Sequence, residues 1–300
     1  MAVGEEDGSA ALSGASAAVI YSFPAVLSLP SGKPLMASLP NDIDGVIERL
    51  QFIIKDSIAR QDRLGYFAAL YNRVTIAVRD GIKAGQFQDG PRMEKLDVIF
   101  AGRYLAAYDA YRSGELPGIS WFKAFNAALG TNYIVLQLLL AGMNAHINLD
   151  LGVAAARVTG PAPGAIDSLQ GDFNKINDVL AALTPVVEQQ LDDCSPVFKE
   201  LSGVAPRLEL KMVGFSMDKA RAAAWAFAKE LAPLRKLPQV ARMATRDMQA
   251  SLIADAVLND GLVIRLIRAR ETTDVAHNIQ VLATGEFKNT VPALIGAPTV

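Results

Sequence analysis

The sequence predicts an all-α protein: a single-domain helical bundle with a central apolar helix and an internal cavity. After residue 40, apolar residues recur at the 3.6-residue spacing of helices, and Gly or Pro separates many of these segments. The one strand-like run, residues 208–213, is short and has no partner of similar pattern. Residues 131–157 are apolar on nearly all faces, which is expected of a helix that other helices surround.

Capping residues and helix breakers mark the starts and ends of the individual helices. Asn, Asp and Ser favour the position before a helix, Pro suits its first turn, and Gly commonly follows its end. In the first half of the chain, helices are therefore expected from Asn41–Asp42 to about Ile58, over 64–82, from Pro91 to near Gly114, and in a short aromatic segment that Ser120 caps. In the second half they are expected over 131–157, over 167–191 with a kink at Pro185, from a Ser216 cap to Leu231, and over about 238–258 and 261–270.

The periodic pattern divides the chain into three parts. Residues 1–39 are rich in Ser, Ala, Gly and Pro without a sustained period, which predicts a loosely ordered arm. Residues 40–270 form the bundle domain. The pattern is lost over 271–300, where we expect an irregular tail.

Composition excludes several classes of protein. Hydrophobic residues make up 51% of the 300 residues and charged residues 20%, so a large core can form. A net charge of −2 argues against nucleic-acid binding, which needs a basic surface. A single cysteine, Cys194, excludes internal disulfides and multi-cysteine zinc sites. An acidic N-terminus and a longest apolar stretch of residues 133–143 predict a cytoplasmic protein without stable membrane insertion.

Five polar side chains lie between residues 137 and 150 of the central apolar segment, and these are the first candidates for a functional site. Burying each one without a partner costs about 1–3 kcal/mol, so each must be satisfied by a neighbour, water, a metal or a ligand. Two pairs, Asn144 with Asn148 and His146 with Asp150, have the i,i+4 spacing that places side chains on one helix face. Either these residues form a structural hydrogen-bond network with Gln137, or they line the polar floor of a ligand cavity.

Further acidic and amide side chains lie among apolar residues elsewhere in the chain. Asp97 stands between apolar neighbours, and Asp172 and Asn177 belong to the helix that begins near residue 167. Asp and Asn suit a hard cation such as Mg²⁺ better than zinc or copper. We therefore expect Asp97, Asp150 and Asp172 as metal ligands if Mg²⁺ is the cofactor.

Acidic helices around an apolar cavity are an architectural analogy to class I isoprenoid-diphosphate enzymes. The motifs differ in detail, because Asp192-Asp193 is not followed by the third carboxylate of a DDxxD motif. Asn177-Asp178 begins like the second metal motif of that fold, but later positions lack metal-binding side chains. The analogy therefore concerns architecture, and a shared architecture does not by itself imply a shared function.

Four short segments resemble the uncharacterised domain-of-unknown-function family 5995. AGMNAHIN at 141–148 is the specific part, and YNRVT, LDVIFAGRY and DFNKIN at 71–75, 96–104 and 172–177 agree with it. Leu149 stands where family members often have a second histidine, which weakens any two-histidine metal scheme. The resemblance implies no established activity. The positions that it singles out are Asp97, His146, Asn148, Asp150, Asp172 and Asn177, and more loosely Arg221 and Trp225.

We expect an enzyme of the lyase or cyclase type that acts on a lipophilic small molecule, such as an isoprenoid or polyene. His146, Asp150 and Asn148 are the expected catalytic residues, with His146 as acid or base and Mg²⁺ as a potential cofactor. Two alternatives remain open: a metal-independent pocket enzyme of the cyclase or isomerase type, and a non-catalytic ligand-binding or scaffold protein. A homo-oligomer is compatible with the sequence. The expected substrate-binding residues are Gln137, Asn144, Asn177, Arg103, Trp121 and Trp225.

Overall fold

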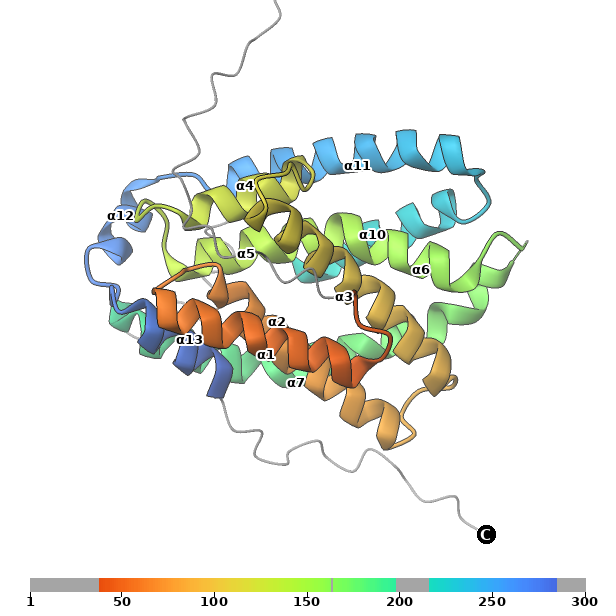
Figure 1. The fold of residues 1–300 in the computed structure, drawn as a ribbon, viewed down its shortest axis with the longest axis horizontal. Coiled ribbons are helices and arrows are strands. Elements are labelled where there is room, and N and C mark those ends of the chain that lie inside the picture. The colour runs from red at the N-terminus through yellow and green to blue at the C-terminus, as the bar shows by residue number, and fades with distance from the viewer. Residues whose placement is uncertain (1–37, 163, 198–215, 285–300) are drawn as a thin grey trace, which may run out of the picture. The chain divides into compact units, whose positions relative to one another are not determined.

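The computed structural model describes residues 38–162, 164–197 and 216–284, and these form helices joined by turns and loops. No strand occurs in these ranges, so the predicted all-α class is confirmed. The run at 208–213 lies outside the described residues, as do residues 1–37 of the expected N-terminal arm. The elements are α1 Ile43–Arg60, α2 Gly65–Lys83, α3 Gly90–Arg112, α4 Ile119–Ala128, α5 Val135–Ala145, η1 His146–Leu151, α6 Gly152–Thr159, η2 Ala165–Leu169, α7 Gln170–Cys194, α10 Met217–Leu231, α11 Lys236–Val257, α12 Leu262–Arg268 and α13 Val275–Thr284 (Figure 1).

The central helix of the prediction is the continuous segment α5–η1–α6, drawn in green in Figure 1. Helices α2, α4, α7 and α11 contact α5, and α3 and α10 contact η1 and α6. Most of its side chains are buried, including all six residues of η1. Because neighbours cover it on several sides, an apolar residue is stabilised on almost any face.

The middle of this segment, His146–Leu151, is a turn of π-helix. A π turn widens an α-helix by one residue and occurs often at functional sites. It contains His146, Asn148 and Asp150, the residues that the sequence singled out. The central helix is therefore least regular where its polar side chains lie.

Two glycines of the central segment allow neighbouring helices to approach closely. A Cβ atom on Gly142 would lie 2.6 Å from Cδ2 of Phe67 on α2. A Cβ atom on Gly152 would lie 2.7 Å from Cδ1 of Phe227 and 2.9 Å from the backbone oxygen of Ala224, both on α10. Real Cβ atoms do not approach neighbours this closely, so both contacts require glycine.

We expect Gly152→Ala to lower the free energy of unfolding by about 1–3 kcal/mol, because a backbone oxygen of α10 must move. Gly102→Ala is the matched control, since the nearest atom to its new Cβ is 3.9 Å away. There Ala should be neutral or stabilise by up to about 1 kcal/mol through its helix propensity. Urea denaturation of both variants measures the difference, and equal midpoints would contradict the close contact.

Most of the predicted helix starts are correct, and one cap is wrong. Asp42 caps α1 by accepting a 2.7 Å hydrogen bond from the Gly45 amide, and Ser216 caps α10. Ser120, in contrast, lies inside the first turn of α4, whose amides are capped from another helix. The backbone amides of Ile119 and Ser120 donate to the Asp247 carboxylate of α11, at 2.7 and 2.9 Å. A cap from a distant segment leaves no local sequence signal.

The expected irregular tail is also partly wrong, because residues 275–284 form α13. This helix contacts α1, α2 and α7 and buries Ile279 and Leu282. The side-chain amide of Asn278 donates to the backbone oxygen of Thr272, which holds the start of α13 against the preceding loop. The helix is short and follows polar residues, so its apolar pattern is too brief to predict a helix.

One helical segment among the described residues, Val135–Thr159, is long and apolar enough to cross a membrane. Of its most apolar 18-residue window, 94% is buried inside the protein. Burial by neighbouring helices accounts for its composition without a bilayer.

Candidate functional site

The candidate site is centred on Asp150 in the π turn, whose side chain is fully buried. Arg103 of α3 donates from Nε to Oδ1 at 2.6 Å. Trp121 of α4 donates from Nε1 to Oδ2 at 2.8 Å, and Nδ1 of His146 lies 3.2 Å from the same oxygen. Burial raises the pKa of Asp150, but Arg103, His146 and Trp121 together outweigh burial and hold that pKa below its ordinary value. The carboxylate is therefore ionised at neutral pH.

His146 is the second member of the site. Burial lowers its pKa more than the neighbouring Asp150 raises it, so the imidazole is neutral at pH 7. An ionised carboxylate accepts only, so the proton of the neutral ring belongs on Nδ1. Nε2 then has a free lone pair and has no hydrogen-bond partner among the described residues. This is the form in which a histidine accepts a proton.

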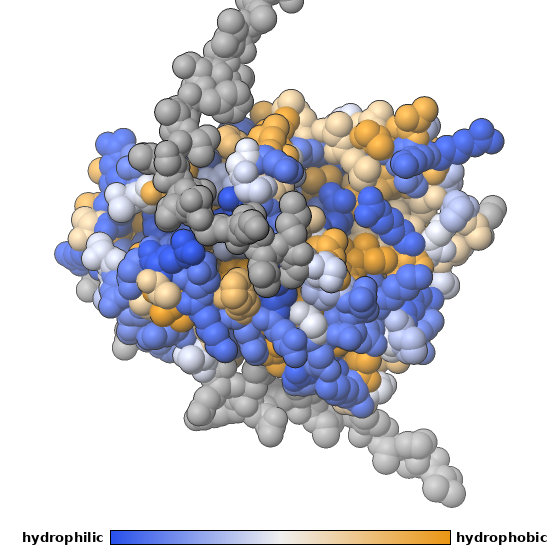
Figure 2. Space-filling model, viewed as in Figure 1, coloured by the Kyte–Doolittle hydropathy of each residue, from blue (hydrophilic) through white to orange (hydrophobic). Residues whose placement is uncertain are grey.

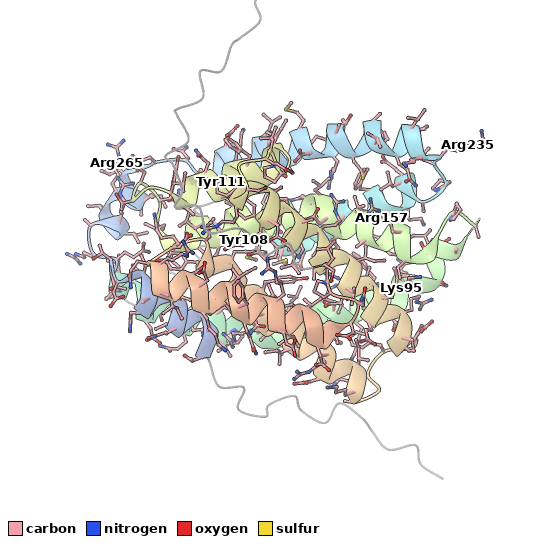
Figure 3. The ribbon with its side chains drawn as sticks, viewed as in Figure 1. Lys95, Tyr108, Tyr111, Arg157, Arg235 and Arg265 are labelled. Atoms are coloured by element: carbon pink, nitrogen blue, oxygen red, sulfur yellow. The ribbon has the colours of Figure 1, made fainter. Side chains whose placement is uncertain are left out.

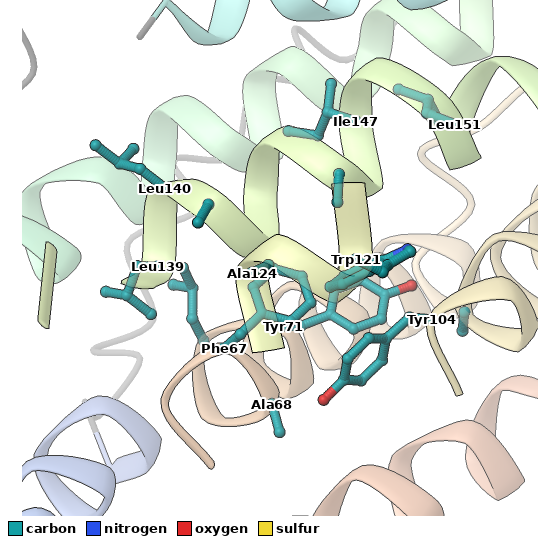
Figure 4. Packing of buried hydrophobic residues seen from close by; sticks show 14 of the residues in the cluster. Phe67, Ala68, Tyr71, Tyr104, Trp121, Ala124, Leu139, Leu140, Ile147 and Leu151 are labelled. Atoms are coloured by element: carbon teal, nitrogen blue, oxygen red, sulfur yellow. The ribbon is translucent and has the colours of Figure 1, made fainter. Parts of the chain in front are cut away.

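Aromatic rings enclose the imidazole on the sides that Asp150 does not occupy. The Phe100 ring stacks on it with a centroid distance of 3.5 Å, and Tyr71 meets it edge-on at 4.5 Å. Phe67, Trp121 and Tyr104 also contact the ring, with centroids 5.7, 5.8 and 6.1 Å from that of His146. Figure 4 shows Phe67, Tyr71, Tyr104 and Trp121 gathered beneath the central helix. These rings exclude water and fix the imidazole.

A groove of about 690 Å³ reaches the site from outside. Asp150, Arg103 and Trp121 form part of its wall, together with Arg157 of α6 and Asp247 of α11. The rest of the lining is apolar or Gly and comes largely from α3, the 116–118 loop and α11. Its size falls in the range of small-molecule pockets, about 300–1,000 Å³.

His146 is only 3% exposed and does not itself line the groove. Trp121 lines the groove and also contacts the imidazole. Asp150 occupies the same part of the wall. Trp121 and Asp150 therefore each join the wall of the groove to the imidazole.

Asn144 and Asn148 lie outside this cluster and bind α11 instead. Asn144 donates to the backbone oxygen of Ala250 at 2.8 Å, and Asn148 donates to Asn144 Oδ1 at 3.0 Å. Arg246 of α11 donates to the Asn148 backbone oxygen at 2.6 Å. Gln137 lies further along and binds the backbone oxygens of residues 257 and 259. All three predicted side chains thus connect the central helix to the α11 region.

A separate cluster contains Asn177 and Trp225, which the sequence placed at the substrate. Arg221 of α10 donates to Asn177 and to the backbone oxygen of Phe173, both on α7. The Trp225 ring packs on Phe173 with a centroid distance of 4.7 Å. Neither residue lines the groove.

The three carboxylates expected to bind Mg²⁺ have different surroundings. Asp172 accepts from the amides of Gln88 and Asp89 just before α3, at 2.7 and 3.1 Å, and from Arg92. Asp150 is held by the donors described above. Asp97 is buried, and its Oδ2 has no hydrogen-bond partner among the described residues. In the part of the chain that the structure describes, no three His, Cys, Asp or Glu side chains form a group that could hold a metal ion.

Asp172→Ala is expected to cost about 1–3 kcal/mol, because two amides and the Arg92 guanidinium lose their acceptor in a buried position. The Asp172 side chain, which is 2% exposed, holds the start of α3 against α7. Asp178→Ala is the control on the same helix, since the Asp178 side chain is 63% exposed. Thermal melts of both variants test this, and a similar small effect for both would contradict the structural role of Asp172.

The sequence reasoning missed Tyr71, Phe100 and Arg157. Tyr71 and Phe100 lie on apolar helix faces, where aromatic residues are ordinary core. Arg157 did leave a signal, because it is the only charged residue in the largely apolar segment 151–159. Its place in the groove depends on how α6 packs beside α3.

The comparison with family models matches residues 43–260 to a family of unknown function, domain-of-unknown-function family 5995. This chain belongs to that family. The match covers α1 to α11 and therefore includes every residue of the candidate site. No curated protein and no solved structure matches the chain.

Proposed function

We propose that this family member is an enzyme that transfers a proton to or from a mostly apolar small molecule bound in the groove. One observation carries the proposal: a neutral histidine with a free Nε2 is oriented by a buried, ionised aspartate that forms part of a pocket wall. Burial of a carboxylate costs several kcal/mol, and three donors are needed to offset it. A purely structural contact between helices does not require a buried charge.

In the proposed reaction, His146 accepts the proton at Nε2 while Asp150 stabilises the imidazolium that forms. Asp150 itself is a weak base, because Arg103 and Trp121 also bind its anionic form. The reaction requires the substrate to reach Nε2 from the groove, and Trp121 is a groove residue that contacts the imidazole ring. Elimination, isomerisation and proton-initiated cyclisation are the reactions that such a group serves, and isoprenoid or polyene compounds fit the apolar lining.

The geometry supports the metal-independent form of this proposal better than the Mg²⁺-assisted form. Asp150 already binds three protein donors, and Asp172 caps the start of α3. A metal at Asp150 would displace Arg103, its closest partner. We therefore assign the chemistry to His146 and Asp150 and treat Mg²⁺ as an outcome of the test.

The test is turnover of a defined panel, comprising farnesyl diphosphate, geranylgeranyl diphosphate, farnesal and farnesoic acid. Each compound is incubated with purified protein in EDTA and in Mg²⁺, and products are analysed by mass spectrometry. Wild-type protein should convert at least one compound in EDTA. His146→Gln should react at least about 100-fold more slowly, the usual contribution of a general base.

His277→Gln is the matched control, because it removes the chain's other histidine, on α13, and should leave the rate unchanged. Turnover that requires Mg²⁺ would replace the metal-independent form with the magnesium form. A His146→Gln rate equal to that of wild type, or no turnover of any compound, would contradict the enzymatic proposal. A thermal shift with a compound that is never converted would favour a non-catalytic binding protein.

A further inference from the structure

The groove contains two arginines whose donors are not fully used by the described residues. Arg103 donates its Nε–H to Asp150, and its two terminal nitrogens form no hydrogen bond to the described part of the chain. Arg157 forms neither a hydrogen bond nor an ion pair with any residue that the structure describes. Figure 3 labels Arg157 on α6, beside α3.

Arg157 lies close enough to Arg103 and Asp150 to sense both charges. Burial lowers the pKa of Arg157, the positive charge of Arg103 lowers it further, and Asp150 raises it. Two guanidinium groups thus share one carboxylate at this end of the groove. Asp247, the other acidic residue of the lining, is occupied by the amides at the start of α4. An unneutralised positive charge therefore remains beside Asp150.

The rest of the groove offers apolar contacts. Its apolar lining includes Val98 and Ile99 of α3, Leu116, and Val240 and Met243 of α11. Val240 and Leu116 are 52% and 65% exposed, which leaves apolar surface available to a ligand. Figure 2 shows hydrophobic surface over the end of α11 that lies near α10, with hydrophilic residues beside it.

We propose that the groove binds an amphipathic anion, with its oxyanion head on Arg157 and Arg103 and its apolar body against α3 and α11. The guanidinium fork matches a carboxylate or a phosphate, because each offers two oxygen atoms that accept a pair of N–H groups. That the bound anion is a substrate rests on the proposed function. Binding of the anion is measured without turnover. It names the substrate class: a lipophilic carboxylate or phosphate monoester.

The test is calorimetric titration of the full chain with decanoate, decyl phosphate and decanol, below the concentrations at which they form micelles. Both anions should bind more tightly than the neutral alcohol. Arg157→Gln should weaken binding of the preferred anion about tenfold or more, since one charge-assisted contact is lost. Binding of decanol should not change. The tighter of the two anions identifies the head group.

Arg235→Gln is the matched control, because Arg235 is an exposed arginine at the start of α11 that does not line the groove. It should bind like wild type, and Arg157→Lys should recover part of the affinity. A thermal melt verifies that each variant is folded. Anion binding no tighter than decanol binding, or equal anion binding by Arg157→Gln, would overturn the proposal.

The two proposals can fail separately. His146→Gln should bind decanoate as wild type does, because His146 does not line the groove. Arg157-dependent binding without His146-dependent turnover retains the anion site and removes the enzyme. His146-dependent turnover without Arg157-dependent binding removes only this substrate class.

Discussion

Asp150→Asn is expected to lower the free energy of unfolding by about 3–5 kcal/mol, the cost of removing one partner from a buried ion pair. Asn has nearly the same shape, so packing is preserved and charge is what changes. Its amide group must face either Arg103 or the Trp121–His146 side, and both sides present donors. At least one donor then loses its acceptor in a buried position.

The effect should depend on pH in a defined direction. Because the pKa of Asp150 in the folded protein lies below its ordinary value of 3.8, its stabilising contribution is fully present above that value. As pH falls through the folded pKa, the wild-type carboxylate is protonated and the advantage over Asn disappears. Urea denaturation at pH 7 and at successively lower pH values below 3.8 follows this loss.

Asp44→Asn is the control for surface charge, because the Asp44 side chain is 60% exposed and pairs with Arg79 and Lys83 in solvent. Exposed pairs contribute about 0–1 kcal/mol. If Asp150→Asn were as mild as Asp44→Asn at pH 7, Asp150 would not be the buried centre of a hydrogen-bond network.

Asp97→Asn is expected to do the opposite and stabilise the protein at pH 8. Burial raises the pKa of Asp97 from 3.8 to about 7, and the charge of Glu94 adds to this. Since a tenfold change in a proton-binding constant corresponds to about 1.4 kcal/mol, ionised Asp97 costs roughly 4 kcal/mol above pH 7. A neutral amide of the same shape does not carry this cost.

The sign follows from proton binding. Between pH 3.8 and about 7, the folded protein holds a proton on Asp97 that the unfolded chain has lost. Stability therefore falls as pH rises through this window, and the penalty is complete above it. The gain of Asp97→Asn should be largest at pH 8 and vanish below about pH 4.

Asp178→Asn provides the comparison for a carboxylate that faces solvent, and it should show no such gain. Chemical denaturation at pH 5 and pH 8 distinguishes them. A variant that is destabilised at pH 8 would mean that ionised Asp97 has a favourable partner. Such a partner would make Asp97 part of a charged site, as the magnesium hypothesis requires.

The helices and the central segment were predictable because their signals are local. Asp42, Pro91 and Ser216 act within one turn of their own helices, and the apolar run of 131–157 reflects burial on every face. The cap of α4 by Asp247 was not predictable in this way. Its two partners are 127 and 128 residues away in sequence, and only the packing of α11 on α4 joins them.

The candidate site was predictable as a set of residues but not as an arrangement. The i,i+4 spacing correctly placed His146 on the face of Asp150 and Asn144 on the face of Asn148. Which neighbours those two faces meet depends on tertiary structure. One face meets Arg103 and Trp121, whereas the other meets α11.

The metal hypothesis shows the same distinction. The residue types suggested metal ligands, but the sequence does not show which hydrogen-bond donors each carboxylate already binds. Asp172 looked like an acid in the first turn of a helix, and it caps the start of a different helix, α3. Arg157 was overlooked because a single charge near a helix end is most often solvated.

The central claim is that His146 is a neutral base, oriented through Nδ1 and free at Nε2. Nitrogen-15 NMR of the histidine rings tests it most directly, because the chain has two histidines and His277→Gln assigns both. The account predicts that His146 has its proton on Nδ1 at pH 7, and that it titrates below 6.5, since burial lowers its pKa. A proton on Nε2 at pH 7, or titration above 6.5, would contradict it.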